Sequence, residues 1–205
     1  MVMTVTQVRP ANQRLRIAAL RLMFAAAFVP LILGVPVWGP APAAALHVAG
    51  IFCIIAAVLG RFWAILYIGG RKNAQVMQDG PYSICRHPLY LFSTIGVAGF
   101  GLTLGSVVFA GALGLAGFAI LSATAAREER FLRSSFGAAY DDYAARVPRI
   151  LPKPGLFRTP AQVTFRVDTL RTNMADAAVF LSVIPLSQII RLAHQSGFLH
   201  GFSIW

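Results

Sequence analysis

Residues 89–126 read LYLFSTIGVAGFGLTLGSVVFAGALGLAGFAILSATAA, and no Asp, Glu, Lys or Arg interrupts them. A single helix of this length would extend about 57 Å, roughly twice the thickness of a bilayer's hydrocarbon core. The stretch must therefore fold back on itself. Gly99, Gly101 and Gly105 lie near its middle, and glycine permits tight turns and close helix contacts. We predict a helical hairpin over residues 89–126 that reverses at these glycines.

The composition of the whole chain indicates a membrane protein. Its 205 residues are 57% hydrophobic and only 12% charged, whereas soluble domains carry about 25% charged residues. Two further apolar runs, each with a single charged residue (Arg21 and Arg61), predict a first span over residues 17–38 and a second over residues 44–68, joined by the turn Gly39–Pro42. With the hairpin, these runs give four spans.

The run Met174–Ala193 is a weaker candidate for a fifth span, because charged residues, a proline and a glutamine dilute it. A helix lying in the plane of the interface is the alternative, and we favour the span. The predicted fold is thus an all-α integral membrane protein with about five transmembrane helices. We divide it into a transmembrane hairpin over 1–58, a core over 59–154 and a C-terminal segment over 155–205.

Basic residues predict the orientation. The net charge is +11, and the Arg and Lys residues cluster over 9–16, 71–86 and 127–171. These three segments fall on one side of the membrane if the first four spans alternate, and that side should be cytoplasmic. Because the positive charge flanks apolar spans, we do not expect nucleic acid as a partner. The sequence indicates no oligomeric state.

The most specific motif is Gly80–Tyr90, which reads GPYSICRHPLY. A second block follows the hairpin, and a shorter motif, RFWA, begins at Arg61. The second block consists of Glu128-Glu129, Phe136-Gly137, Tyr140, Tyr143, Val147-Pro148-Arg149 and Pro152. Together these motifs resemble the isoprenylcysteine carboxyl methyltransferase and phospholipid methyltransferase family over about residues 59–154.

The resemblance implies a membrane-embedded fold and methyl transfer from S-adenosylmethionine. It also implies a cofactor site on the cytoplasmic side, built from loops and helix ends. The expected cofactor-binding residues are His87, Tyr90, Leu91, Tyr82, Glu128 and Glu129. The expected catalytic residues are Arg86 and Arg61.

These residue types suit the chemistry, because methyl transfer from a sulfonium is an in-line displacement that depends on positioning and charge. His87 can hydrogen-bond the ribose, carboxylate or amine of the cofactor, and Tyr90 offers an aromatic face. The side chains of Glu128 and Glu129 diverge by about 100° on a helix, so we expect only one to face the ligand. A surface pair between Glu129 and Arg133 is the structural alternative.

Arg61 lies ten residues before Arg71, which is about 15 Å of helix and deep for a guanidinium. It either snorkels to the surface, contacts the carboxylate or phosphate of a substrate, or holds a carbonyl of the catalytic loop. Two cysteines are too few for a thiolate zinc site. His47, His194 and His200 lack partners at ligand spacing, so we interpret them as interfacial and predict no metal site.

The expected substrate is a lipid or lipid-like small molecule in the membrane, methylated on a carboxylate oxygen, a sulfur or a nitrogen. A membrane sterol reductase is an alternative, since such enzymes also carry an R-H-P-x-Y loop. A nonenzymatic membrane protein is another, although its polar residues would be expected along a midplane pathway rather than at one face.

Overall fold

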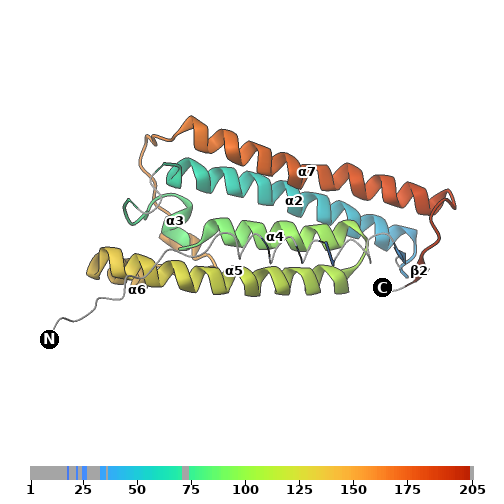
Figure 1. Ribbon diagram of the computed structural model, residues 1–205, viewed down its shortest axis with the longest axis horizontal. Coiled ribbons are helices and arrows are strands. Elements are labelled where there is room, and N and C mark those ends of the chain that lie inside the picture. Colours follow the sequence, from blue (N-terminus) through green and yellow to red (C-terminus); the bar gives the residue numbers. More distant parts are fainter. Residues whose placement is uncertain are drawn as a thin grey trace.

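The computed structural model describes residues 18, 22, 25–26, 33–35, 37–70 and 74–203 (Figure 1). More than half of the predicted first span, residues 17–38, lies outside the described residues, and so do all of the basic segment 9–16 and Arg71. The structure therefore does not test those predictions.

Four long helices lie side by side in the order α7, α2, α4, α5, with the short helices at one end (Figure 1). The long helices are α2 (Pro40–Ile68), α4 (Pro88–Thr103), α5 (Val107–Phe136) and α7 (Val167–Gln195). The short ones are α3 (Pro81–Ile84), α6 (Ala138–Arg146) and the 3-10 turn η1 (Pro154–Leu156). Among the described residues, α2, α5 and α7 are long and apolar enough to cross a membrane, and α4 is a shorter apolar helix.

The hairpin reverses between α4 and α5, at Leu104–Ser106. Gly105 has a φ of 75°, which favours glycine, and Ser106 caps α5 by accepting a hydrogen bond from the N–H of Phe109 at 2.9 Å. Gly99 serves helix packing, since a Cβ there would lie 2.6 Å from the Cβ of Cys53 on α2. Glycine therefore allows α2 and α4 to approach closely.

Helix α7 is longer than the predicted run, lies alongside α2, and is one of the helices long and apolar enough to cross a membrane (Figure 1). His47 of α2 connects α7 to α2 and α4. The Nδ1 of His47 lies 2.8 Å from the carbonyl of Thr103, and its Nε2 lies 2.6 Å from the side-chain nitrogen of Gln188 on α7. The carbonyl can only accept, so Nδ1 donates and Nε2 accepts.

The prediction that His47 is interfacial was therefore wrong, because its ring is buried between three helices with 4% of its surface exposed. Two short strands, β1 (Gly34–Val35) and β2 (Phe202–Ser203), also depart from the all-α prediction. They pair in parallel, with Gly34 opposite Phe202. Two residues cannot produce a recognisable alternating pattern, so these strands could not be predicted from the sequence.

Candidate functional site

The two sequence blocks meet at the end of the bundle that carries α3 and α6 (Figure 1). The backbone N–H groups of Arg86 and His87 donate to the carbonyls of Pro148 and Arg149 at 2.9 and 3.0 Å. These bonds satisfy the two backbone N–H groups that come just before α4. Helix α4 begins at Pro88, and a proline there costs no hydrogen bond because the first N–H groups of a helix have no partner within it. The signature loop and the Val-Pro-Arg segment are thus joined by backbone bonds that any residue could form.

Further bonds hold the beginning of the signature loop. Gly80 donates its N–H to the carbonyl of Arg158 at 2.8 Å, and the hydroxyl of Tyr143 donates to the carbonyl of Tyr82 at 2.7 Å. Gly80 has a φ of 58°, and a Cβ there would collide with the ring of Tyr67. The glycine of the motif is required by both its backbone conformation and its surroundings.

Glu129 lies at the centre of the cluster and is completely buried. Arg149 binds its carboxylate with both Nε, at 3.1 and 3.2 Å, and Nη2, at 2.7 Å. The Nε2 of His87 and the Nη1 of Arg86 each lie 3.3 Å from its Oε1. The alternative pairing of Glu129 with Arg133 is not formed, since Arg133 instead binds Asp141 at 2.8 Å.

His87 lies between the two glutamates. Its Nε2 faces Glu129, while its Nδ1 is 3.9 Å from the Oε2 of Glu128. Its ring stacks on Tyr90 with centroids 5.3 Å apart and planes inclined by 2°. Both carboxylates therefore approach one imidazole, one at each nitrogen. The expectation that only one of the two glutamates faces the ligand stays a prediction, since His87 is a side chain of the site and not the ligand.

Several polar atoms in this region are buried and have no hydrogen-bond partner among the described residues. They are the Nε and Nη1 of Arg86 and the hydroxyls of Tyr82 and Tyr140. Burial raises the pKa of Tyr140 to about 12, and burial also raises the pKa of Tyr82 well above its ordinary value. Both phenols therefore remain neutral donors at physiological pH. Leaving a buried donor unpaired costs about 1–3 kcal/mol, which a ligand with acceptor oxygens would recover.

The two remaining predicted site residues lie apart from Glu129. Leu91 is one turn into α4, half-buried, and donates its N–H to the carbonyl of His87 at 3.2 Å. Arg61 lies between helices, where it donates to the hydroxyl of Ser93 at 2.6 Å and stands 3.8 Å from Asp176. The contacts of Arg61 are thus on α4 and α7, whereas Leu91 bonds the backbone of His87, a partner of Glu129.

Arg149 is the functional candidate that sequence reasoning missed. It was visible as part of the second block, but Arg130 and Arg133 are closer to Glu129 in the chain and were the obvious partners. The signal that could have found it is the presence of Val147-Pro148-Arg149 in the same family-like block as Glu129. The pairing itself depends on the tertiary fold.

Comparison with known proteins bears directly on these two blocks. The family model described as phospholipid methyltransferase matches residues 41–139, which include the signature loop and both glutamates. The chain belongs to the phospholipid methyltransferase family. Arg149 and α7 lie beyond the matched residues.

Two curated relatives cover most of the chain. The nickel-cobalt-cadmium resistance protein NccN of Alcaligenes xylosoxydans xylosoxydans is 35% identical over 190 residues, which are 92% of this chain and 89% of the relative. The cobalt-zinc-cadmium resistance protein CzcN of Cupriavidus metallidurans is 34% identical over 189 residues, which are 92% of this chain and 87% of the relative. No solved structure matches this chain.

Proposed function

We propose that this protein transfers a methyl group from S-adenosylmethionine to a lipophilic acceptor in the membrane. The observation that carries the proposal is the union of the two family blocks around one buried group, Glu129, which brings Arg86, His87 and Arg149 together. Membership of the family supports the reaction type. The three apolar helices support a membrane-resident acceptor.

The side chains present fit the cofactor. S-adenosylmethionine, when bound, supplies an electrophilic methyl group on a sulfonium, and it also carries a carboxylate, an ammonium and a ribose diol. The buried Nε of Arg86 and the hydroxyl of Tyr140, which have no hydrogen-bond partner among the described residues, suit the carboxylate. The stacked, parallel rings of Tyr90 and His87 suit the sulfonium or the adenine of the cofactor, because an aromatic face attracts a cation and can stack on another ring.

We assign different roles to the two glutamates. Glu129 is fully buried and is bound by Arg149, so its role is to orient Arg86 and His87. Glu128 has 20% of its side chain exposed and lies on the other side of His87, which makes it the carboxylate for the cofactor's ammonium or ribose hydroxyls. Arg149 is then a positioning residue that acts through Glu129.

The acceptor is proposed to be an oxygen or sulfur nucleophile in preference to an amine. A carboxylate is already ionised and needs no general base, whereas an ammonium must lose a proton before it attacks. His87 is enclosed by two carboxylates and the Tyr90 ring, a setting that suits orientation of the cofactor better than proton removal. The site is proposed to face the cytoplasm, where the cofactor is made.

Calorimetric titration of the purified protein with S-adenosylmethionine tests this assignment. His87→Ala should weaken binding at least about tenfold, because one or more charge-assisted contacts are lost. His200→Ala is the matched control, since His200 is exposed on the C-terminal segment and its loss should leave affinity unchanged. Unaltered affinity in a well-folded His87→Ala protein would overturn the assignment of His87, and absence of binding by the native protein would overturn the function.

A part in metal resistance is a second, compatible candidate, and the names of both relatives favour it. We propose that methylation of a membrane component would be the route by which this chain contributes. Cells lacking the protein should then be more sensitive to cobalt or cadmium, and the native gene should restore tolerance. Full restoration by a His87→Ala gene would separate resistance from methyl transfer.

A further inference from the structure

The segment that follows α6 lies across the signature loop and is bonded to it along its length. We call residues 148–158 the strap. Lys153 donates its backbone N–H to the carbonyl of Ile84 at 2.9 Å, and the carbonyl of Arg158 accepts from the N–H of Gly80 at 2.8 Å. The strap lies beyond the residues matched by the family model. It is thus tied to the signature loop without being part of the matched core.

Helix α5 shows how far the beginning of the strap lies from the apolar part of the bundle. The uncharged run ends at Ala126, and Glu129 is three residues, or about 4.5 Å, further along the helix. Arg149, the second residue of the strap, contacts the Glu129 carboxylate at 2.7 Å. The polar headgroup layer on each side of a bilayer is about 5–7 Å thick. With the uncharged run of α5 in the hydrocarbon core, the strap therefore begins at the depth of the headgroups.

The other end of the strap lies against the side of α2. The ring of Phe157 contacts the ring of Trp63, with centroids 5.9 Å apart. Trp63 is five residues, or about 7.5 Å, before Ile68, the last residue of α2, and α2 is long and apolar enough to cross a membrane. The strap therefore reaches the membrane interface instead of lying above it in water.

The strap exposes the two kinds of side chain that suit such an interface. Leu151 has 73% of its surface exposed, and Phe157 has 50%. Lys153 is exposed between them, and its ammonium forms no ion pair with the described residues. Residues 143–167 contain five basic residues and no acidic one. Exposed apolar side chains beside cations are the combination that binds anionic membrane surfaces.

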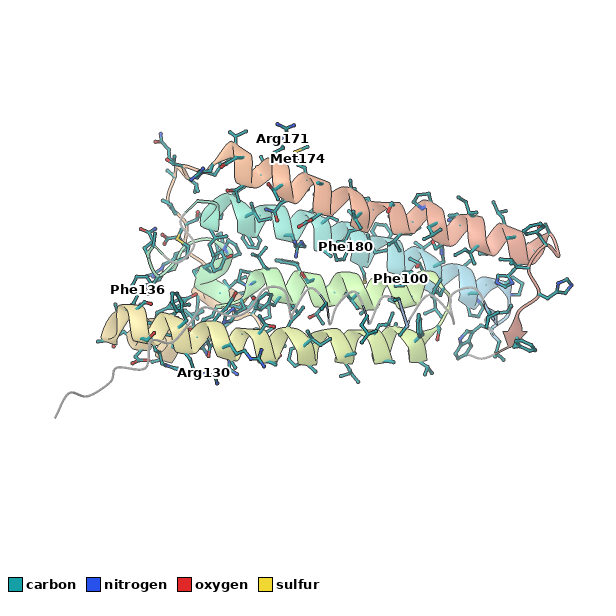
Figure 2. All side chains as sticks on the ribbon, in the orientation of Figure 1. Phe100, Arg130, Phe136, Arg171, Met174 and Phe180 are labelled. Atoms are coloured by element: carbon teal, nitrogen blue, oxygen red, sulfur yellow. The ribbon has the colours of Figure 1, made fainter. Side chains whose placement is uncertain are left out.

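Cations also lie near this depth on the two outer helices of the bundle. Figure 2 shows Arg130 pointing away from the bundle on α5 and Arg171 pointing away from it on α7. Arg130 is next to Glu129, and Arg171 lies three residues before the predicted apolar run that begins at Met174. Both arginines are exposed. Cations spread in this way favour an extended anionic surface over a small soluble anion as the partner.

We propose that the strap binds the anionic surface of the bilayer in which the protein resides. Leu151 and Phe157 enter the interface, and Lys153 pairs with anionic headgroups. Because the strap also bonds the signature loop, this contact keeps the loop closed. The lipids involved act on the strap and take no part in the reaction. Binding of the strap does not depend on the proposed function, whereas its effect on cofactor affinity rests on that function.

A fluorophore tests the depth of the strap in nanodiscs of phosphatidylcholine, alone or mixed with an equal part of phosphatidylglycerol. Both native cysteines are replaced with alanine, and the fluorophore is attached through Leu151→Cys. Lipids with brominated chains should quench it, and more strongly in the anionic nanodisc. Asp142→Cys is the control and should stay unquenched, because its neighbour Asp141 binds Arg133, which lies about 10 Å beyond Ala126 along α5.

The labelling rate of Cys85 measures whether lipid contact keeps the loop closed. Cys85 is completely buried, and the residues on both sides of it bond the strap. In a Cys53→Ala background, N-ethylmaleimide should label Cys85 about fivefold more slowly in the anionic nanodisc, the effect expected for one cation near an anionic surface. High salt should remove the difference, because it screens the charges.

Variants of Lys153 separate this contact from a general effect of anionic lipid on thiol chemistry. Lys153→Gln should be labelled at nearly equal rates in the two nanodiscs, whereas Lys153→Arg should keep the native difference because it keeps the charge. The side chain is exposed, so neither change should affect folding. Arg146→Gln is the matched control. It removes the same charge from a residue that bonds Gln78 and its own helix, and it should behave as the native protein does.

Three results would overturn the proposal: equal labelling rates of the native protein in the two nanodiscs, an undiminished difference in Lys153→Gln, or a fluorophore at position 151 that no lipid quenches. The last result would place the strap in water, with a soluble acidic molecule as its partner. Titration of the same nanodiscs with S-adenosylmethionine separates the two proposals. Tighter cofactor binding in the anionic nanodisc would support both. If the native protein binds no cofactor in either lipid, the proposed function fails and the membrane contact of the strap stands.

Discussion

A buried carboxylate is the residue-scale feature on which the candidate site depends. Removing Glu129 from water is costly unless charged hydrogen-bond donors replace the water that it loses. Arg149, Arg86 and His87 lie within 2.7 to 3.3 Å of its oxygens. Because those partners come from two separated parts of the chain and Glu129 itself lies on α5, one side chain links the signature loop, α5 and the segment after α6.

Arg149→Ala tests this link. The substitution removes the two-point pairing of a buried carboxylate, so it should destabilise the protein by about 1–2 kcal/mol, a value lowered by the partial exposure of Arg149. It should also weaken cofactor binding, because Arg86 and His87 lose their orientation. Arg149→Lys should recover only part of both, since lysine cannot form the two-point contact.

The control is Arg146→Ala, because Arg146 is exposed and bonds Gln78 and a backbone carbonyl of its own helix. Thermal unfolding in detergent and calorimetry provide the two measurements. Equal loss of stability in the Arg146 and Arg149 variants would contradict a special role for Arg149.

Cys85, within the signature loop, gives a second residue-scale prediction. It is completely buried, and burial raises the pKa of its thiol to about 12. Since the raised pKa keeps the thiol protonated, the reactive thiolate is scarce at any pH well below 12. In a Cys53→Ala background, maleimide should label Cys85 slowly at pH 8 in the folded protein and fully after denaturation. Rapid labelling of the folded protein would show that the loop is not closed as described.

At the scale of elements, the sequence predicts best what is encoded locally. The 89–126 hairpin follows from a long uncharged stretch with central glycines, and α4 and α5 reverse at Gly105. The bounds of α7 could be predicted only roughly, because its polar residues made the apolar run look too weak for a transmembrane helix. One of them, Gln188, bonds His47 of α2, a contact between residues that no local pattern connects.

Close packing of α2 against α4 can be tested at glycines. Gly99→Ala places a Cβ 2.6 Å from the Cys53 Cβ and 3.0 Å from the Gly50 carbonyl, so it should destabilise the protein by about 1–3 kcal/mol. Gly111→Ala on α5 is the matched control, since a Cβ there has no atom of the described structure within 4 Å. It should be neutral or stabilising by up to about 1 kcal/mol. A Gly99→Ala protein as stable as the control would contradict the packing.

The whole molecule has two distinct ends. The signature loop, α3 and α6 gather at one end, and β2 with the end of α7 lies at the other (Figure 1). Most charged side chains of the described residues lie in the second half of α5, α6 and the segment after it, whereas Arg61 lies between helices. The division of the chain at residues 58 and 154 remains a prediction. The cytoplasmic orientation also remains a prediction, because the fold does not say which end of the bundle faces the cytoplasm.

Orientation can be measured by cysteine reporters after both native cysteines are replaced with alanine. Reporters at Asp79 and Asp141 should be labelled from the cytoplasmic side, by the positive-inside rule. Reporters at Gly39 and Ser196 should be labelled from the opposite side, because they lie just before α2 and just after α7. Labelling of Ser196 from the same side as Asp79 would show that α7 does not span the membrane.

Transfer of a radiolabelled methyl group tests the central claim most directly. The purified protein is incubated with methyl-labelled S-adenosylmethionine and a membrane lipid extract, and the organic phase is counted and resolved. The account predicts a labelled lipophilic product whose formation falls at least about tenfold in His87→Ala and is unchanged in His200→Ala. Native protein that binds the cofactor but transfers no label to the organic phase would contradict it.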